Sequence, residues 1–118
     1  MNKINIKLDK NIFPKYNRKE NVTFRYDIIG LYSVSHSNDA TITTKFICDE
    51  MKKLNKDPTQ LTIMDGTGGL GGNTISFCNI FKNVIVFEID EKRYEMLKSN
   101  MNNYNFNNYV IYSSKVCT

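Results

Sequence analysis

Two stretches near the start of the chain alternate hydrophobic and polar residues with a period of two, over 3–9 and 21–28. The hydrophobic members are Ile4, Ile6, Leu8, Val22, Phe24, Tyr26 and Ile28. A period of two is typical of strands that bury one face. The pattern predicts a β-hairpin, with a boundary at Gly30.

After Gly30 the hydrophobic period changes to that of a helix, over 39–54. One stripe of this helix would carry Ala40, Thr44, Ile47, Met51 and Leu54. Ser37, Asn38 or Asp39 is expected to cap its start, because short polar side chains accept hydrogen bonds from the first free N–H groups. Asp57–Pro58 then interrupts the chain before the next element.

The second half of the chain alternates short apolar runs with helical patterns. The runs 61–64 and 84–87 are nearly continuous, as in parallel strands covered on both faces, and 109–112 is a third candidate strand. A short helix is predicted over 73–81, and a second one from an Asp90 cap to about Asn102. The order β-α-β-α-β predicts an α/β fold, half of a doubly wound parallel sheet.

The charge is concentrated at the N-terminus, because seven basic and three acidic residues within 1–27 account for the whole net charge of +4. A basic segment beside a neutral domain would suit a polyanionic partner, although a solvated surface explains the charge equally well. Three dispersed cysteines predict neither a disulfide framework nor a zinc site. We also predict an intracellular protein, cytoplasmic or nuclear, without membrane association.

The stretch 61–74, LTIMDGTGGLGGNT, reads as a strand, a tight turn and the start of a helix. Its segment 66–71 satisfies the pattern GxGxxG, in which glycines permit positive φ and leave the backbone open to a ligand. Context strengthens the pattern, because a second predicted strand ends in Glu88. An acid at that tip can accept hydrogen bonds from both hydroxyls of a ribose. We therefore expect a site for a nucleotide-like cofactor, with Asp90 as the second choice of acid.

Asp65 bears on which cofactor the turn would hold. A carboxylate just before the first glycine would repel the pyrophosphate of a dinucleotide. The ammonium of S-adenosylmethionine would instead be attracted to it. An NAD-type dinucleotide-binding domain stays open as an alternative, whereas a P-loop is excluded because Gly72 and Asn73 stand where its lysine is needed.

The segment 65–74, followed by VIVFEID at 84–90, resembles motif I and the next strand of class I S-adenosylmethionine-dependent methyltransferases. It is most similar to the trimethylguanosine synthase group, the RNA cap guanine-N2 methyltransferases, whose pattern is D-x-x-x-G-x-G-G-N-T. Upstream, YSVS at 32–35 is similar to that group's W-F-S-V-T-P. The resemblance implies a Rossmann-like class I methyltransferase fold and cofactor contacts from Asp65, Gly66, Thr67, Gly69, Gly71, Asn73, Thr74, Glu88, Ser33 and Ser35.

The same resemblance implies an RNA substrate, a cap guanine N2 or another base amine, and residues 30–118 as an incomplete cofactor-binding domain behind a basic extension, 1–29. The family's S-P-P-W or N-P-P-Y motif, which holds the acceptor amine, has no counterpart, since Pro14 and Pro58 are the only prolines. No catalytic residue is therefore assigned. We expect a cofactor-binding half that either dimerises or pairs with a complementing C-terminal half. A non-catalytic S-adenosylmethionine-binding module, or a truncated relic, is the alternative.

Two isolated residues are assigned structural roles. His36 is expected to be a turn residue, because no acid can be paired with it. Cys78 is expected to be a small core residue on the helix after the glycine-rich turn.

Overall fold

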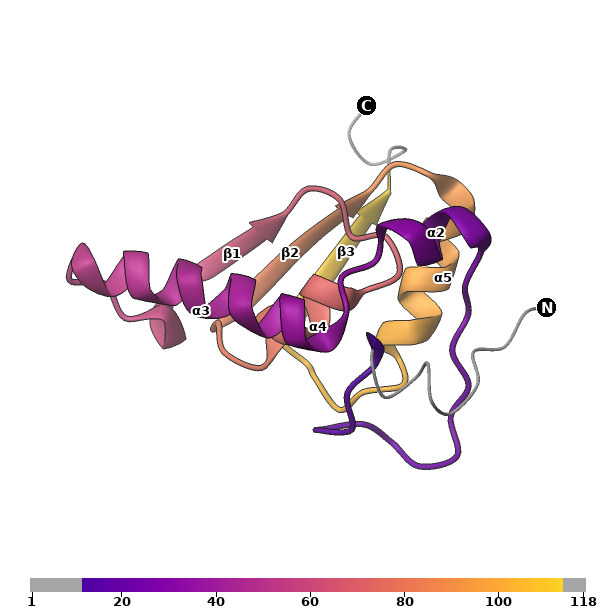
Figure 1. Cartoon of the computed structure of the whole chain (residues 1–118), viewed down its shortest axis with the longest axis horizontal. Coiled ribbons are helices and arrows are strands. Elements are labelled where there is room, and N and C mark those ends of the chain that lie inside the picture. The colour runs from indigo at the N-terminus through magenta and orange to yellow at the C-terminus, as the bar shows by residue number, and fades with distance from the viewer. Residues whose placement is uncertain (1–11, 114–118) are drawn as a thin grey trace.

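The computed structural model describes residues 12–113, apart from the side chains of Tyr32 and Ser33. Figure 1 shows its elements along the chain. They are α2 (Ile28–Ser33), α3 (Ser37–Lys53), the 3₁₀ helix η1 (Pro58–Gln60), β1 (Thr62–Asp65), α4 (Gly72–Cys78), β2 (Asn83–Glu88), α5 (Glu91–Met101) and β3 (Tyr109–Ser113).

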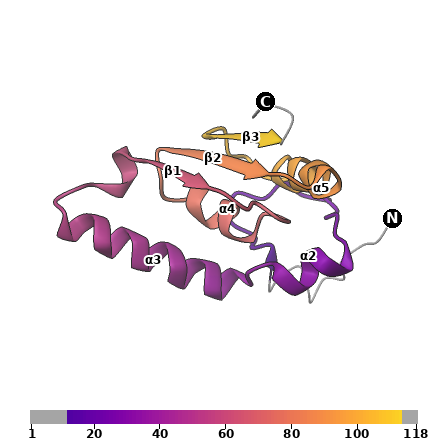
Figure 2. The ribbon, with the colours of Figure 1, turned by 90° about the horizontal axis from the view of Figure 1, so that it is seen from above.

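The three strands form one parallel sheet in the order β1-β2-β3, with Met64 beside Ile85 and Ile85 beside Val110. Both crossovers step across the sheet in the same direction, so their right-handedness puts α4 and α5 on the same face. Seen from above, α3 and α4 lie on one side of the strands (Figure 2). The prediction of an α/β fold and of half a doubly wound sheet is confirmed.

The helix-facing side of the sheet holds the core. Val84 and Val86 of β2 are buried beneath Leu97 and Met101 of α5, all at 1% exposure or less. Leu97 and Met101 lie four residues apart, on one face of α5. Asp90 caps this helix as predicted, accepting a hydrogen bond from the N–H of Arg93 at 2.9 Å. The predicted cap of α3 is wrong. The backbone of His36 is extended at that position, so the helix begins already at Ser37, and the His36 side chain makes no capping bond.

The N-terminal segment folds differently from the prediction. The first predicted strand, over 3–9, lies outside the described residues, and the second is wrong, because 22–27 forms no strand in the described part of the chain. Its alternation has another cause: the ring of Phe24 stacks on that of Phe13 with centroids 4.0 Å apart, within the core shared with α5. The helix α2 then begins at Ile28 and spans the predicted boundary at Gly30.

A buried side-chain amide ties this segment to the domain. Asn100 of α5 is 0% exposed. Its Oδ1 accepts from the N–H of Arg25 at 2.7 Å, and its Nδ2 donates to the carbonyls of Arg25 and Leu70, both at 3.0 Å. The amide therefore hydrogen-bonds the backbone of the 22–27 segment, as a neighbouring strand would, and it joins that segment to the glycine-rich turn.

We predict that Asn100→Ala lowers the free energy of unfolding by about 2–4 kcal/mol, because each backbone group left buried without a partner costs roughly 1–3 kcal/mol. Urea denaturation measures this. Asn107→Ala, at an exposed position after the same helix, is the control and should change stability by less than about 0.5 kcal/mol. Equal effects of the two substitutions would contradict the role given to Asn100.

The other face of the sheet carries apolar side chains that no described helix covers. By register it presents Met64, Ile85, Phe87, Val110 and Tyr112, with Met64 at 64% and Val110 at 40% exposure. Parallel sheets are otherwise covered on both faces. We expected the sheet to be covered on both faces, but within residues 12–113 helices cover one face only. No helix in this range is long and apolar enough to cross a membrane.

The uncovered face and the open edge of β1 predict self-association of the isolated chain, since exposed apolar sheet surface recruits a partner. Met64→Lys should shift the chain toward monomer in size exclusion with light scattering. Ile42→Lys, on α3 and equally exposed at 66%, is the matched control and should leave association unchanged. A monomeric wild-type chain would refute the prediction.

Candidate functional site

The glycine-rich turn, residues 66–71, leaves the end of β1 and is anchored on β2. The N–H of Gly68 donates to the carbonyl of Phe87 at 2.9 Å. Gly69 and Gly71 have φ of 57° and 108°, values that glycine adopts without strain. A Cβ at Gly68 would lie 2.5 Å from Leu97, so this glycine lets α5 pack against the turn.

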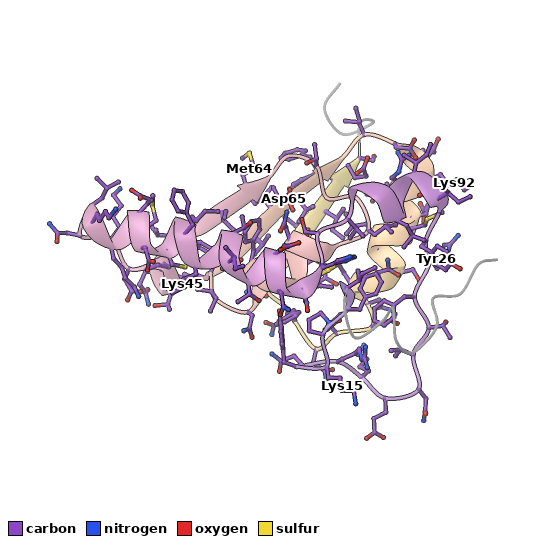
Figure 3. All side chains as sticks on the ribbon, in the orientation of Figure 1. Lys15, Tyr26, Lys45, Met64, Asp65 and Lys92 are labelled. Atoms are coloured by element: carbon purple, nitrogen blue, oxygen red, sulfur yellow. The ribbon has the colours of Figure 1, made fainter. Side chains whose placement is uncertain are left out.

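Asp65 is the last residue of β1, directly before the turn (Figure 3). Its Oδ1 accepts from the N–H of Thr67 at 3.2 Å, and its Oδ2 accepts from the hydroxyl of Thr74 at 2.9 Å. One carboxylate thus bridges the two ends of the turn. The strand, the turn and α4 are fixed relative to one another by it.

Glu88 lies at the tip of β2 and is 8% exposed. Its Oε1 accepts from the N–H of Gly69 at 2.8 Å, and its Oε2 accepts from the N–H of Asp90 at 2.9 Å. Each carboxylate oxygen can accept more than one hydrogen bond, so both retain capacity for a ligand.

A cavity of about 260 Å³ lies between the turn, α2 and β2. It brings together several of the predicted cofactor contacts, namely Thr67, Gly69, Asn73, Glu88 and Ser35. The Oδ1 of Asn73 is buried there and has no hydrogen-bond partner in the described structure. An unpaired buried acceptor beside a cavity is suited to a donor group of a ligand.

The other predicted contacts do not line this cavity. Asp65 and Thr74 support the turn, Gly66 is exposed, and a side chain at Gly71 would point at Leu97 and Met101 in the core. Ser33 is the last residue of α2, and its side chain lies outside the described part of the structure. Their contact with a cofactor stays a prediction.

The structure adds cavity residues that the sequence analysis missed, from α2 and α5. Ile29 and Val34 line the cavity from the α2 side, and Arg93 lines it from α5. Arg93 lies 3.2 Å from the carboxylate of Asp90 and 3.7 Å from that of Asp27, which caps α2. Asp27 precedes Gly30 by three residues, and aspartate is a residue type that caps helices. The strand-like alternation of 21–28 obscured this signal. No local signal marks Arg93.

The remaining candidates have structural roles in the described residues. Burial raises the pKa of the Cys78 thiol to about 12, so this thiol stays protonated within the core. His36 is exposed at the start of α3. Among residues 12–113, no cluster of three or more histidine, cysteine or acidic side chains could bind a metal ion.

A parallel β-α-β-α-β unit with a glycine-rich first turn and an acid at the tip of β2 is a Rossmann-like cofactor-binding fold. Residues 60–117 match the family model of RNA cap guanine-N2 methyltransferases. This match confirms the resemblance to S-adenosylmethionine-dependent methyltransferases over that part of the chain, and S-adenosylmethionine is the cofactor of the family.

Two known proteins are similar to parts of the chain. The uncharacterized protein L320 of Acanthamoeba polyphaga mimivirus is 36% identical over 70 residues, which are 56% of this chain and 27% of that protein. A dimethyladenosine transferase from Plasmodium falciparum, 22% identical, superposes with a TM-score of 0.46 over 58% of this chain and 25% of its own. The chain thus matches about a quarter of the length of each.

We predict that Gly72→Ala impairs the cavity whereas Gly66→Ala does not. A Cβ at Gly72 would lie 2.5 Å from the carbonyl oxygen of Ser35 and displace the segment that lines the cavity, while a Cβ at Gly66 meets nothing within 4 Å. Calorimetry with S-adenosylhomocysteine should show at least about tenfold weaker binding for Gly72→Ala, or 1.4 kcal/mol. Equal affinities of the two variants would contradict this.

Proposed function

We propose that the described domain, residues 12–113, binds S-adenosylmethionine in the cavity beside the glycine-rich turn, as the cofactor-binding half of an RNA methyltransferase. The observation that carries this proposal is the buried carboxylate of Glu88. It faces the cavity, and each of its two oxygens accepts one backbone hydrogen bond, from the N–H of Gly69 or of Asp90. The family match over 60–117 supports the same cofactor.

The chemistry of the cavity residues fits this cofactor. Glu88 would accept hydrogen bonds from the ribose hydroxyls. The unpaired Oδ1 of Asn73 would accept from the ammonium of the methionine end, and Asp65 would add negative potential beneath the turn. Ile29 and Val34 supply apolar surface for the rest of the ligand.

A dinucleotide fits the same residues less well. Its pyrophosphate needs positive potential at the turn, yet Asp65 is fixed there by two hydrogen bonds. Among the described residues, Arg93 is the one cationic side chain that lines the cavity. It lies between the carboxylates of Asp27 and Asp90, which offset its charge.

In methyl transfer the acceptor atom attacks the methyl carbon in line with the departing sulfur, so the protein mainly positions the reactants and excludes water. The described residues would hold the cofactor for this step. The group that orients an acceptor amine has no candidate among them, and the chain matches only 27% of its viral relative. We therefore propose that the acceptor site is supplied by a complementing half or a second subunit, with a base amine of RNA as acceptor.

We predict that Glu88→Gln weakens binding of S-adenosylhomocysteine by about 1–3 kcal/mol, because an amide loses one acceptor and the negative charge toward the ribose. Isothermal titration calorimetry measures the change. Glu50→Gln, on α3 and away from the cavity, removes the same charge and is expected to bind like wild type.

Unchanged affinity in Glu88→Gln would remove Glu88 from the site. Thermal shift separates the cofactor classes, since only a ligand of the folded state raises the melting temperature. A shift with S-adenosylhomocysteine and none with NAD is expected, and the reverse would overturn the proposed function.

A further inference from the structure

A second hollow, of about 490 Å³, lies on the outer side of the domain between α5 and β3. We call it the α5–β3 groove. It is lined by Arg25, Tyr94, Glu95, Lys98, Asn102 and Tyr109, with Ser99, Val110 and Ile111. None of these residues lines the cofactor cavity.

Cationic side chains from two separate parts of the chain meet at this groove. Lys98 extends from α5, where its Nζ lies 5.1 Å from the centroid of the Tyr94 ring. Lys19 reaches the end of α5 and donates to the carbonyl of Asn102 at 2.9 Å. Arg25 comes from the N-terminal segment, and Glu95 is the one acid that lines the groove within residues 12–113.

The backbone of Arg25 is fixed by hydrogen bonds within the domain. Its backbone N–H and carbonyl are both hydrogen-bonded to Asn100. The Nε of its guanidinium is buried and has no hydrogen-bond partner among the described residues. The guanidinium thus retains donor capacity on a backbone that Asn100 fixes, which favours binding of an anion.

Aromatic rings complete the lining. Tyr94 and Tyr109 are half-buried and contribute to the groove from α5 and β3. The hydroxyl of Tyr109 is a hydrogen-bond donor at neutral pH, and burial raises its pKa further above the ordinary value of 10.0. Aromatic rings beside cationic side chains are the combination with which proteins bind single-stranded nucleic acids, because bases stack while phosphates pair with the cations.

The groove and the cofactor cavity lie along one helix. Arg93, in the first turn of α5, lines the cavity, and Asn102, just after its last turn, lines the groove. Nine residues of helix separate them, a rise of about 14 Å. A strand bound in the groove could therefore extend along α5 toward the cofactor.

We propose that the α5–β3 groove binds a single-stranded segment of the RNA substrate, with phosphates on Arg25 and Lys98 and a base on Tyr94 or Tyr109. This inference rests on the proposed function for the identity of the substrate. RNA is favoured over an extended peptide at the β3 edge because cations outnumber acids in the groove and lie beside aromatic rings.

The test is fluorescence anisotropy with a capped and an uncapped decaribonucleotide, titrated at several salt concentrations. Arg25→Gln/Lys98→Gln should bind RNA at least about tenfold more weakly and should have a smaller slope of log affinity against log salt, since each lost phosphate contact lowers that slope by roughly 0.7. The control is Lys45→Gln/Lys53→Gln, which removes the same charge from exposed positions of α3 and should change affinity less than about twofold.

Lys98→Gln alone, at an exposed position, serves if the double variant does not fold, and should itself weaken RNA binding. Photo-crosslinking of 4-thiouridine-substituted RNA should label Tyr94 or Tyr109. Equal loss in the groove variant and the control, no RNA binding by the wild type, or crosslinks only outside the groove would each overturn the proposal.

Calorimetry with S-adenosylhomocysteine on the same variants separates the two proposals. If RNA binding depends on the groove but no cofactor binds, the groove proposal is supported and the cofactor site is refuted. If the cofactor binds but RNA affinity does not depend on the groove, the cofactor site is supported and the groove proposal is refuted.

Discussion

The buried amide of Asn100 is the constraint on which the positions of the cavity beside the glycine-rich turn and of the α5–β3 groove both depend. It hydrogen-bonds the backbone of Arg25 and the carbonyl of Leu70, and so fixes the N-terminal segment and the glycine-rich turn to α5. The segment it holds leads directly into α2, which lines the cofactor cavity, and carries the arginine of the α5–β3 groove. One buried amide thus sets the position of both the cavity and the groove.

The sheet and its crossover helices could be predicted because their signals are local. Continuous apolar runs, an Asp90 cap and a glycine-rich turn each act within a few residues, and the order of elements then implies the topology. The N-terminal segment could not be predicted in this way. The alternation in 21–28 predicts burial of alternate side chains. It does not indicate whether a strand or the side chain of Asn100 hydrogen-bonds the backbone N–H and carbonyl groups.

The residues of the candidate site also differ in whether local sequence signals predict them. Glu88 and the turn were predictable, since a motif and a strand tip specify them. Arg93, Ile29 and Val34 were not, because the fold brings α5 and the α2 region to one cavity from positions some sixty residues apart in sequence. The predicted contacts of Asp65 and Gly71 show the limit of a motif: it identifies residues that the turn needs, without separating those that face a ligand from those that shape the backbone.

The hydrogen bonds between Asn100 and Arg25 have a consequence for the order in which the protein is made. Translation delivers Phe13, Phe24 and α2 first, whereas their partners on α5 emerge from the ribosome some seventy-five residues later. The β-α-β-α unit consists of near neighbours and can form progressively during synthesis. The segment that carries Phe13 and Phe24 can dock only when α5 is complete. The cavity needs α2, which follows this segment, and is therefore among the last features to form, although α2 precedes the sheet in the sequence.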